Sequence, residues 1–375
     1  MNRIKFKIGT IIIFLIILSL SARSLCRIIS TNAPDFNVLW LAAKDLSTDS
    51  NPYLNPDIFT GVGYPPNTLL FYLPLMAFPY KVAQAIFVLL IFASTVGAVY
   101  LSLKIVLKKV PWQVSLLALS LTFLSFPTKF TLGMGQNNTV AFFTLLFAYY
   151  FYKQKRISLA GVLLGISIAF KTVFGFFLLF FLLKREWKTI LYSLLPIGLS
   201  IFLVALISDV NLYEFYIKEV VPPLLNLSGR EIYYNQGLVG FIARLSGNLI
   251  LRRYATISIS AVLVAITSFF ALKRKSQDLQ FSLFVTTLLL VDTLSWQHHF
   301  IWLVFPFVLL TAHAVKKKQI EPLVLIGISY LLVSWNFKNP SQFSNFPISL
   351  ILSNTFYGGL ILYLLNIQLL LKPKE

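Results

Sequence analysis

Asp35 is the acidic side chain whose setting says most about chemistry. It follows the first apolar segment of the chain and begins the run DFNVLW, in which most neighbours are apolar. Such an amphipathic pattern can lie in a membrane interface and hold the carboxylate against the bilayer, where it can act as a general base. Because Pro34-Asp35 also precedes a helix-like run, a helix N-cap is an equally good local interpretation.

Lys171 is the basic side chain with the most unusual surroundings, because apolar residues flank it on both sides. An unpaired ammonium at membrane depth would cost several kcal/mol, so we expect an anionic group beside it. A phosphate suits this position, since a helical hairpin tip offers free backbone N–H groups as well as the charge. Snorkelling of the side chain to the outer interface is the alternative.

Other polar residues could bind a sugar or a phosphate. Gln136 and Asn137 follow two glycines in a predicted outer turn, although a plain turn explains them nearly as well. His298 and His299 are adjacent on a predicted helix and point about 100° apart, which disfavours joint metal ligation. One imidazole could instead bind or protonate a phosphate oxygen, and packing in the core is an equal alternative.

The composition indicates an integral membrane protein. Hydrophobic residues make up 57% of the 375 positions, mean hydropathy is +0.79 and only 12% of residues are charged, which excludes an ordinary soluble domain. The net charge of +19 does not indicate nucleic acid, because Lys and Arg cluster at the ends of apolar runs. Cys26 is the only cysteine, so an intrachain disulfide and a cysteine-based zinc site are excluded.

Apolar runs near the roughly 20 residues that cross a bilayer recur along the whole chain. We expect about ten spans, near 8–28, 82–103, 112–127, 139–152, 189–208, 254–272, 279–294, 299–315, 322–335 and 347–371. The segment 157–183 is too short for two spans and has basic residues on both flanks, so it predicts a re-entrant helical hairpin with Lys171 at its tip. The fold class is therefore all-α, in one domain over residues 1–375 with outer loops near 29–81 and 209–253.

The charge distribution predicts the orientation. With a cytoplasmic N-terminus, 20 of the 32 Lys and Arg residues but only four of the 13 acidic residues fall inside, a strong bias by the positive-inside rule. The apolar run 8–20, with SLSA at residues 19–22, also resembles a cleaved signal. Asp35 is expected on the outer side of the membrane whether or not this segment is cleaved.

Several motifs, taken in order, resemble glycosyltransferase family 87, the polyprenyl-phosphate-mannose-dependent alpha-mannosyltransferases of the GT-C superfamily. They are Asp35-Phe36, Asn51-Pro52-Tyr53, Tyr64-Pro65-Pro66, Gly135-Gln136-Asn137-Asn138, Ala169-Phe170-Lys171, Asn235-Gln236-Gly237-Leu238 and Trp296-Gln297-His298-His299. The resemblance implies that Asp35 is the first-loop base and that Lys171, His298 and His299 lie near the lipid phosphate. A proline often follows the hairpin lysine in that family, whereas this chain has Thr172.

The resemblance implies an inverting transfer of a sugar, with mannose expected, from a polyprenyl phosphate to a glycolipid or glycan hydroxyl at the outer membrane face. Nucleotide sugars are cytoplasmic, so an outward-facing site also favours a lipid-linked donor. We expect Arg230 to join the phosphate-binding residues, and the sugar or acceptor contacts to come from Tyr53, Tyr64, Gln136, Asn137 and Gln236. We expect no cofactor and no metal ion, and partners limited to the donor, the acceptor and membrane lipid.

Rival functions predict other sequence features. A lipid or glycolipid flippase or transporter favours two related halves, and we find no convincing internal repeat. A polysaccharide polymerase or ligase favours a long late outer loop, whereas 336–346 is short. A purely structural membrane subunit is the third alternative.

Overall fold

The computed structural model describes residues 9, 11–12, 14–16, 19, 26, 30–58, 61–208, 211–227, 229–273, 276–343 and 345–372. Regular structure in these ranges is helical, and the pairing of Asn235 with Trp296 is a single β-bridge outside any strand. The prediction of an all-α fold is therefore confirmed for the described part of the chain. The first predicted span, 8–28, lies largely outside the described residues.

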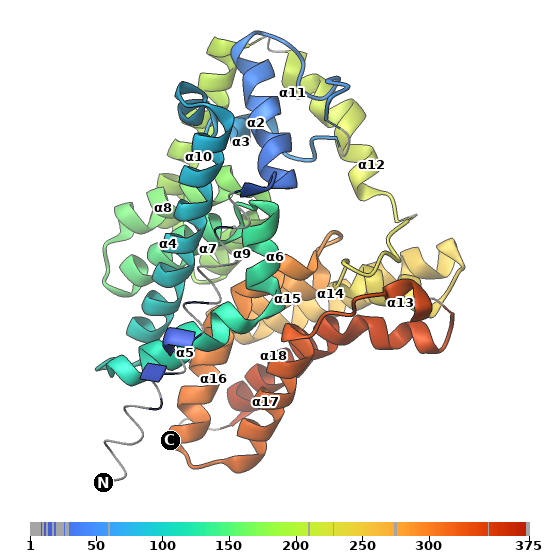
Figure 1. Ribbon diagram of the computed structural model, residues 1–375. Coiled ribbons are helices and arrows are strands. Elements are labelled where there is room, and N and C mark those ends of the chain that lie inside the picture. The colour runs from blue at the N-terminus through green and yellow to red at the C-terminus, as the bar shows by residue number, and fades with distance from the viewer. Residues whose placement is uncertain are drawn as a thin grey trace.

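The helices follow one another along the chain as drawn in Figure 1. Their bounds are α2 Pro34–Ser47, α3 Pro66–Leu69, η1 Leu73–Ala77, α4 Tyr80–Val106, α5 Trp112–Leu124, α6 Phe126–Met134, α7 Asn138–Lys153, α8 Ile157–Phe170, η2 Thr172–Gly175, α9 Phe176–Leu183, α10 Trp187–Ile207, α11 Asn211–Phe215, η3 Tyr216–Val220, α12 Val221–Leu225, α13 Leu238–Leu245, α14 Leu249–Leu272, α15 Gln277–Val291, η4 Gln297–Leu303, α16 Val304–Lys316, α17 Ile320–Ser334, η5 Pro340–Phe343, η6 Ile348–Ser353 and α18 Asn354–Leu371.

Within the described ranges, five stretches of helix are long and apolar enough to cross a membrane, namely α4, α10, α14, η4 with α16, and η6 with α18. The pair α5 and α6, bent by 65°, would make a sixth. The expected count of about ten is not confirmed, because helices such as α15 and α17 have only 15 residues, short of the roughly 20 needed. On α10, Leu191, Leu195 and Leu199 are each more than half exposed, as suits a face turned to lipid. The chain is a multi-pass membrane protein.

The segment 157–183 turns back on itself. Before it, the hydroxyl of Tyr152 donates to Glu186 Oε1, which lies after the segment, at 3.0 Å. Gly161 packs against Thr189 and Gly165 against Ser193, so α8 and α10 run in the same direction and α9 is the return limb between them. The break between α8 and α9 falls at Lys171, which therefore lies at the far end from both basic flanks.

The basic ends of several helices gather at one end of the bundle. Lys104 at the end of α4 lies 5.0 Å from the ring centroid of Tyr150 on α7. Lys153 Nζ is 2.7 Å from Asp278 Oδ1 at the start of α15, and Lys184 Nζ donates to the Ala271 carbonyl of α14 at 2.6 Å. The other ends of α7, α8 and α15 lead to Asn137, Lys171 and Asp292, so the polar candidates lie opposite the lysines.

The close approach of α8 to α10 generates a stability prediction. A Cβ at Gly165 would meet the backbone carbonyl oxygen of Ser193 and lie 2.9 Å from Pro196 Cγ, whereas Gly198 has nothing within 4 Å. Gly165→Ala should therefore lower the free energy of unfolding by about 1–3 kcal/mol relative to Gly198→Ala, measured by thermal unfolding in detergent. Both glycines are inside helices, so the gain in helix propensity from glycine to alanine is the same in the two variants and cancels in the comparison. Equal stability of the two variants would contradict this packing.

Candidate active site

Asp35 lies in the first turn of α2, where Ala33 is the N-cap and no side chain caps the helix. The N-cap interpretation of Asp35 is therefore wrong. Its carboxylate instead accepts a hydrogen bond from Gln136 Nε2, about 100 residues further along the chain. Burial raises the pKa of Asp35, while this hydrogen bond and the charge of Lys171 act in the opposite direction.

Gly135 makes the contact between Asp35 and Gln136 possible. It ends α6 in the left-handed conformation with φ of +69°, which suits glycine. A Cβ there would also lie 2.7 Å from the Cβ of Phe36 and 3.0 Å from that of Ala33. Glycine thus allows the junction of α6 and α7 to approach the start of α2, and the next residue faces the carboxylate.

A directional chain of hydrogen bonds connects Lys171 with Asp35. The ammonium of Lys171 donates to the Tyr64 hydroxyl at 3.2 Å, and that hydroxyl donates to Gln136 Oε1 at 3.0 Å. The amide of Gln136 then donates to Asp35. Burial raises the pKa of Tyr64, so the phenol stays neutral and keeps its proton to donate. Within the described ranges no direct ion pair joins Asp35 and Lys171.

Tyr64 is held by the two predicted outer loops, which contact each other here. Tyr53 donates from its hydroxyl to the Tyr64 carbonyl at 2.8 Å, and its ring stacks on Phe215 with 6.1 Å between centroids. Tyr216 donates to the Gly63 carbonyl at 3.3 Å. Figure 1 shows α2 and α11 at the same end of the molecule. Tyr53 therefore positions Tyr64 through its backbone.

The end of α8 is fixed by side chains from other helices. Thr68 donates to the Ala169 carbonyl at 2.9 Å, and Asn137 Nδ2 donates to the Phe170 carbonyl at 3.2 Å, so carbonyls that a helix end leaves unpaired are satisfied. Lys171 is only 6% exposed. An ammonium has three donors, and the Tyr64 hydroxyl accepts one of them.

His298 and His299 lie in η4 beside this cluster and are 4% and 5% exposed. Among the described residues, neither ring nitrogen of His298 has a hydrogen-bond partner, nor does Nδ1 of His299. Lys171 exerts a Coulombic effect on both rings. Buried polar groups are nearly always hydrogen-bonded, so these nitrogens have unused capacity for hydrogen bonds with a polar group.

Arg230 and Gln236 use their polar groups within the protein. The Arg230 guanidinium donates to the carbonyls of Pro223, Leu224 and Asn226 at the end of α12. The amide of Gln236 donates to the carbonyls of Tyr233 and Leu352 and accepts from the backbone N–H groups of Thr355 and Phe356. All hydrogen-bonding positions of the Gln236 amide are thus in use, and it joins the 233–237 loop to the start of α18.

Two polar residues that sequence reasoning left without a role belong to this region. Asp292 caps the C-terminus of α15, and its Oδ2 lies 3.9 Å from His299 Nδ1. Asn138 is fully buried, yet neither amide atom has a partner among the described residues. The sequence prediction extended the span to 294, whereas α15 ends at Val291, which leaves Asp292 at the helix end. The sequence signal that could have identified Asp292 is an acidic residue six positions before His298.

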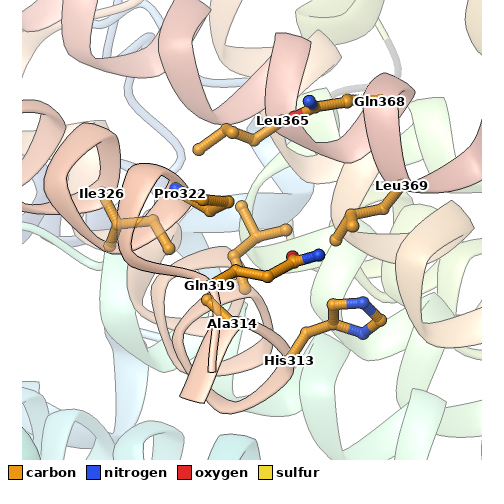
Figure 2. Close-up of a pocket in the computed structure, with 9 residues that line it drawn as sticks. His313, Ala314, Gln319, Pro322, Ile326, Leu365, Gln368 and Leu369 are labelled. Carbon is orange, nitrogen blue, oxygen red and sulfur yellow. The ribbon is translucent and has the colours of Figure 1, made fainter. Parts of the chain in front are cut away.

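The cavity in Figure 2 lies elsewhere and does not suit a substrate. It is about 10 Å³ in volume and is lined by residues of α16, α17, α18 and the loop at Gln319, among them His313 and Gln368. This volume holds about one water molecule. The described residues also include no group of three or more His, Cys, Asp or Glu side chains that could hold a metal ion.

Comparisons with known proteins agree on one family. The model of glycosyltransferase family 87 matches residues 62–306, a range that includes Tyr64, Lys171 and His298 but begins after Asp35. A polyprenol-phosphate-mannose-dependent alpha-(1-2)-phosphatidylinositol pentamannoside mannosyltransferase of Mycolicibacterium smegmatis is 26% identical over 294 residues, or 74% of this chain and 69% of that protein.

A second relative, the polyprenol-phosphate-mannose-dependent alpha-(1-2)-phosphatidylinositol mannoside mannosyltransferase of Mycobacterium tuberculosis, is 23% identical over 180 residues, or 47% of this chain and 42% of that protein. The family match extends over more than half of the chain and carries most of the residues that surround Lys171. The chain therefore belongs to glycosyltransferase family 87 and is a glycosyltransferase of the membrane.

Proposed function

We propose that this protein transfers a mannosyl group, with inversion, from a polyprenyl phosphate to a hydroxyl of a glycolipid or glycan. The observation that carries the proposal is the hydrogen-bonded chain from Lys171 through Tyr64 and Gln136 to Asp35. The names of both mycobacterial relatives, which are polyprenol-phosphate-mannose-dependent and act on phosphatidylinositol mannosides, support the choice of donor and acceptor class.

The separation of Asp35 from Lys171 suits a two-part substrate. A direct ion pair would leave neither group free, whereas two neutral side chains between them keep a carboxylate and an ammonium apart. The carboxylate can then face an acceptor hydroxyl while the ammonium faces the phosphate of the donor. Attraction between an ammonium and a phosphate is strong in such surroundings, because burial at 6% exposure excludes the water that would screen it.

The reaction would proceed in one displacement. Asp35 takes the proton from the acceptor hydroxyl, whose oxygen attacks the anomeric carbon from the side opposite the phosphate. The bond from that carbon to the phosphate oxygen breaks, and the polyprenyl phosphate leaves with the bonding electron pair. Lys171 stabilises the charge that develops on it, and the unpartnered nitrogens of His298 are available for further hydrogen bonds.

We also propose that the site faces the outside of the membrane. The lysines at the ends of α4, α7 and α9 gather opposite Lys171, and basic residues favour the cytoplasmic side. Asp35 and Lys171 then lie on the extracytoplasmic side, which nucleotide sugars do not reach. A sugar carried on a membrane lipid is available there.

Replacing Asp35 tests the proposed base. Asp35→Asn should lower mannosyl transfer by about 10²–10⁴-fold without loss of folded protein, measured as products by mass after incubation with polyprenyl-phosphate mannose and a panel of glycolipid acceptors. Asp45→Asn, on the same helix but paired with Asn55, is the control. A base must be ionised, and burial raises the pKa of Asp35 above its ordinary value of 3.8. As the pH is lowered, wild-type activity should therefore begin to fall at a higher pH than an ordinary aspartate would give. Full turnover by Asp35→Asn would exclude this base.

Replacing Lys171 tests the phosphate contact. Lys171→Met keeps an unbranched side chain that is shorter by one atom and removes the charge, so the donor KM should rise and kcat should fall, with the acceptor KM unchanged. The matched control is Lys184→Met at the opposite end of the same hairpin, where the ammonium contacts Ala271 and Gln280. A donor KM that is the same in Lys171→Met and wild type would contradict the role of this lysine.

A further inference from the structure

Asp292 has the features of a functional acid rather than of a helix-stabilising one. It is the C-cap of α15, where the helix dipole is negative and a carboxylate is unfavourable. Its side chain is 18% exposed, and the backbone N–H of Leu294 approaches it at a long 3.5 Å. A carboxylate in this place contributes little to the stability of its own helix, so its neighbours across the site are the groups on which it can act.

His299 is the neighbour that the Asp292 carboxylate faces. The distance from Asp292 Oδ2 to His299 Nδ1 is 3.9 Å, and this nitrogen has no hydrogen-bond partner in the described part of the chain. The imidazole lies parallel to the indole of Trp302, with 4.9 Å between centroids and 6° between planes. Stacking on the indole fixes the plane of the imidazole. Attraction between the Asp292 carboxylate and Nδ1 then turns the opposite edge of the ring, which carries Nε2, away from Asp292.

Asp292 also balances positive charge around the hairpin tip. Lys171 and Arg230 both act on it electrostatically, and Asp292 and Asp35 are the two carboxylates that act on Lys171. His298 packs edge-on against His299 with centroids 4.7 Å apart. The acid beside His299 is thus also the one on which the charges of Lys171 and Arg230 act.

We propose that Asp292 is a positioning residue for the donor phosphate: it orients the His299 imidazole toward the phosphate and offsets the charge of Lys171 and Arg230 before the donor binds. This inference rests on the proposed function, since it needs a phosphate at Lys171. Asp292 acts through His299 and does not itself contact the reacting atoms. The Asp292 carboxylate weakly repels the donor phosphate, but it also orients the imidazole that stabilises the leaving phosphate. Asp292 should therefore affect kcat rather than the affinity for the donor.

Kinetics of Asp292→Asn separate these effects. The variant should lower kcat roughly 10- to 100-fold, as removal of a carboxylate that orients a functional histidine does in metal sites. The donor KM should stay the same or fall, because removing a negative charge cannot weaken attraction for an anion. Asp278→Asn, at the other end of the same helix, is the control and should show no such pattern.

A double-variant cycle shows whether Asp292 acts through His299. In the His299→Gln background, Asp292→Asn should lower kcat by less than about twofold, because residues that act as a unit are not additive. Asp292→Glu, which keeps a carboxylate, should be faster than Asp292→Asn. Folding of each variant is checked by thermal unfolding, and if Asp292→Asn does not fold, the glutamate variant in both backgrounds carries the same comparison.

The outcomes distinguish this inference from the proposed function. Additive losses in the double variant, or a raised donor KM with unchanged kcat, would overturn the role of Asp292 while leaving the transfer reaction intact. Absence of transfer by the wild-type protein from polyprenyl-phosphate mannose would instead overturn the proposed function.

Discussion

The buried ammonium of Lys171 is the constraint on which the rest of the site depends. A charge removed from water needs compensation, and the protein supplies only part of it: one neutral hydroxyl at 3.2 Å and two carboxylates at longer range. The surrounding imidazoles leave three nitrogens without partners in the described structure. This incomplete compensation favours an anionic ligand beside Lys171.

The fold brings Asp35 to this cation by close approaches that only small residues allow. Gly135 lets the start of α2 pack closely against the junction of α6 and α7, and Gly161 and Gly165 let α10 pack closely against α8. The contact at Gly135 brings Gln136 to Asp35. The contact between α8 and α10 holds the hairpin so that its tip lies at Tyr64. Because the family match begins at residue 62, the role proposed for Asp35 rests on this contact and on the resemblance of the first loop.

The hairpin could be predicted from sequence because its signal is local: two basic flanks separated by fewer residues than two crossings need. The number of spans could not, since helices as short as α15 and α17 are apolar without having the length to cross. Gln236 was expected to contact sugar, and nothing in the sequence indicated that its amide would bond backbone atoms at the start of α18, more than 100 residues away. Asp292 could not be placed from sequence, because one turn of helix decides whether it is inside a span or at its end, and composition does not locate that boundary.

The most direct test of the account is a structure of the protein with a non-hydrolysable phosphonate analogue of polyprenyl-phosphate mannose. The account predicts a phosphonate oxygen at about 3 Å from Lys171 Nζ, the distance of a charge-assisted hydrogen bond, with the anomeric carbon on the side of the Asp35 carboxylate. A headgroup bound away from Lys171, or a sugar whose anomeric carbon is turned from Asp35, would contradict it.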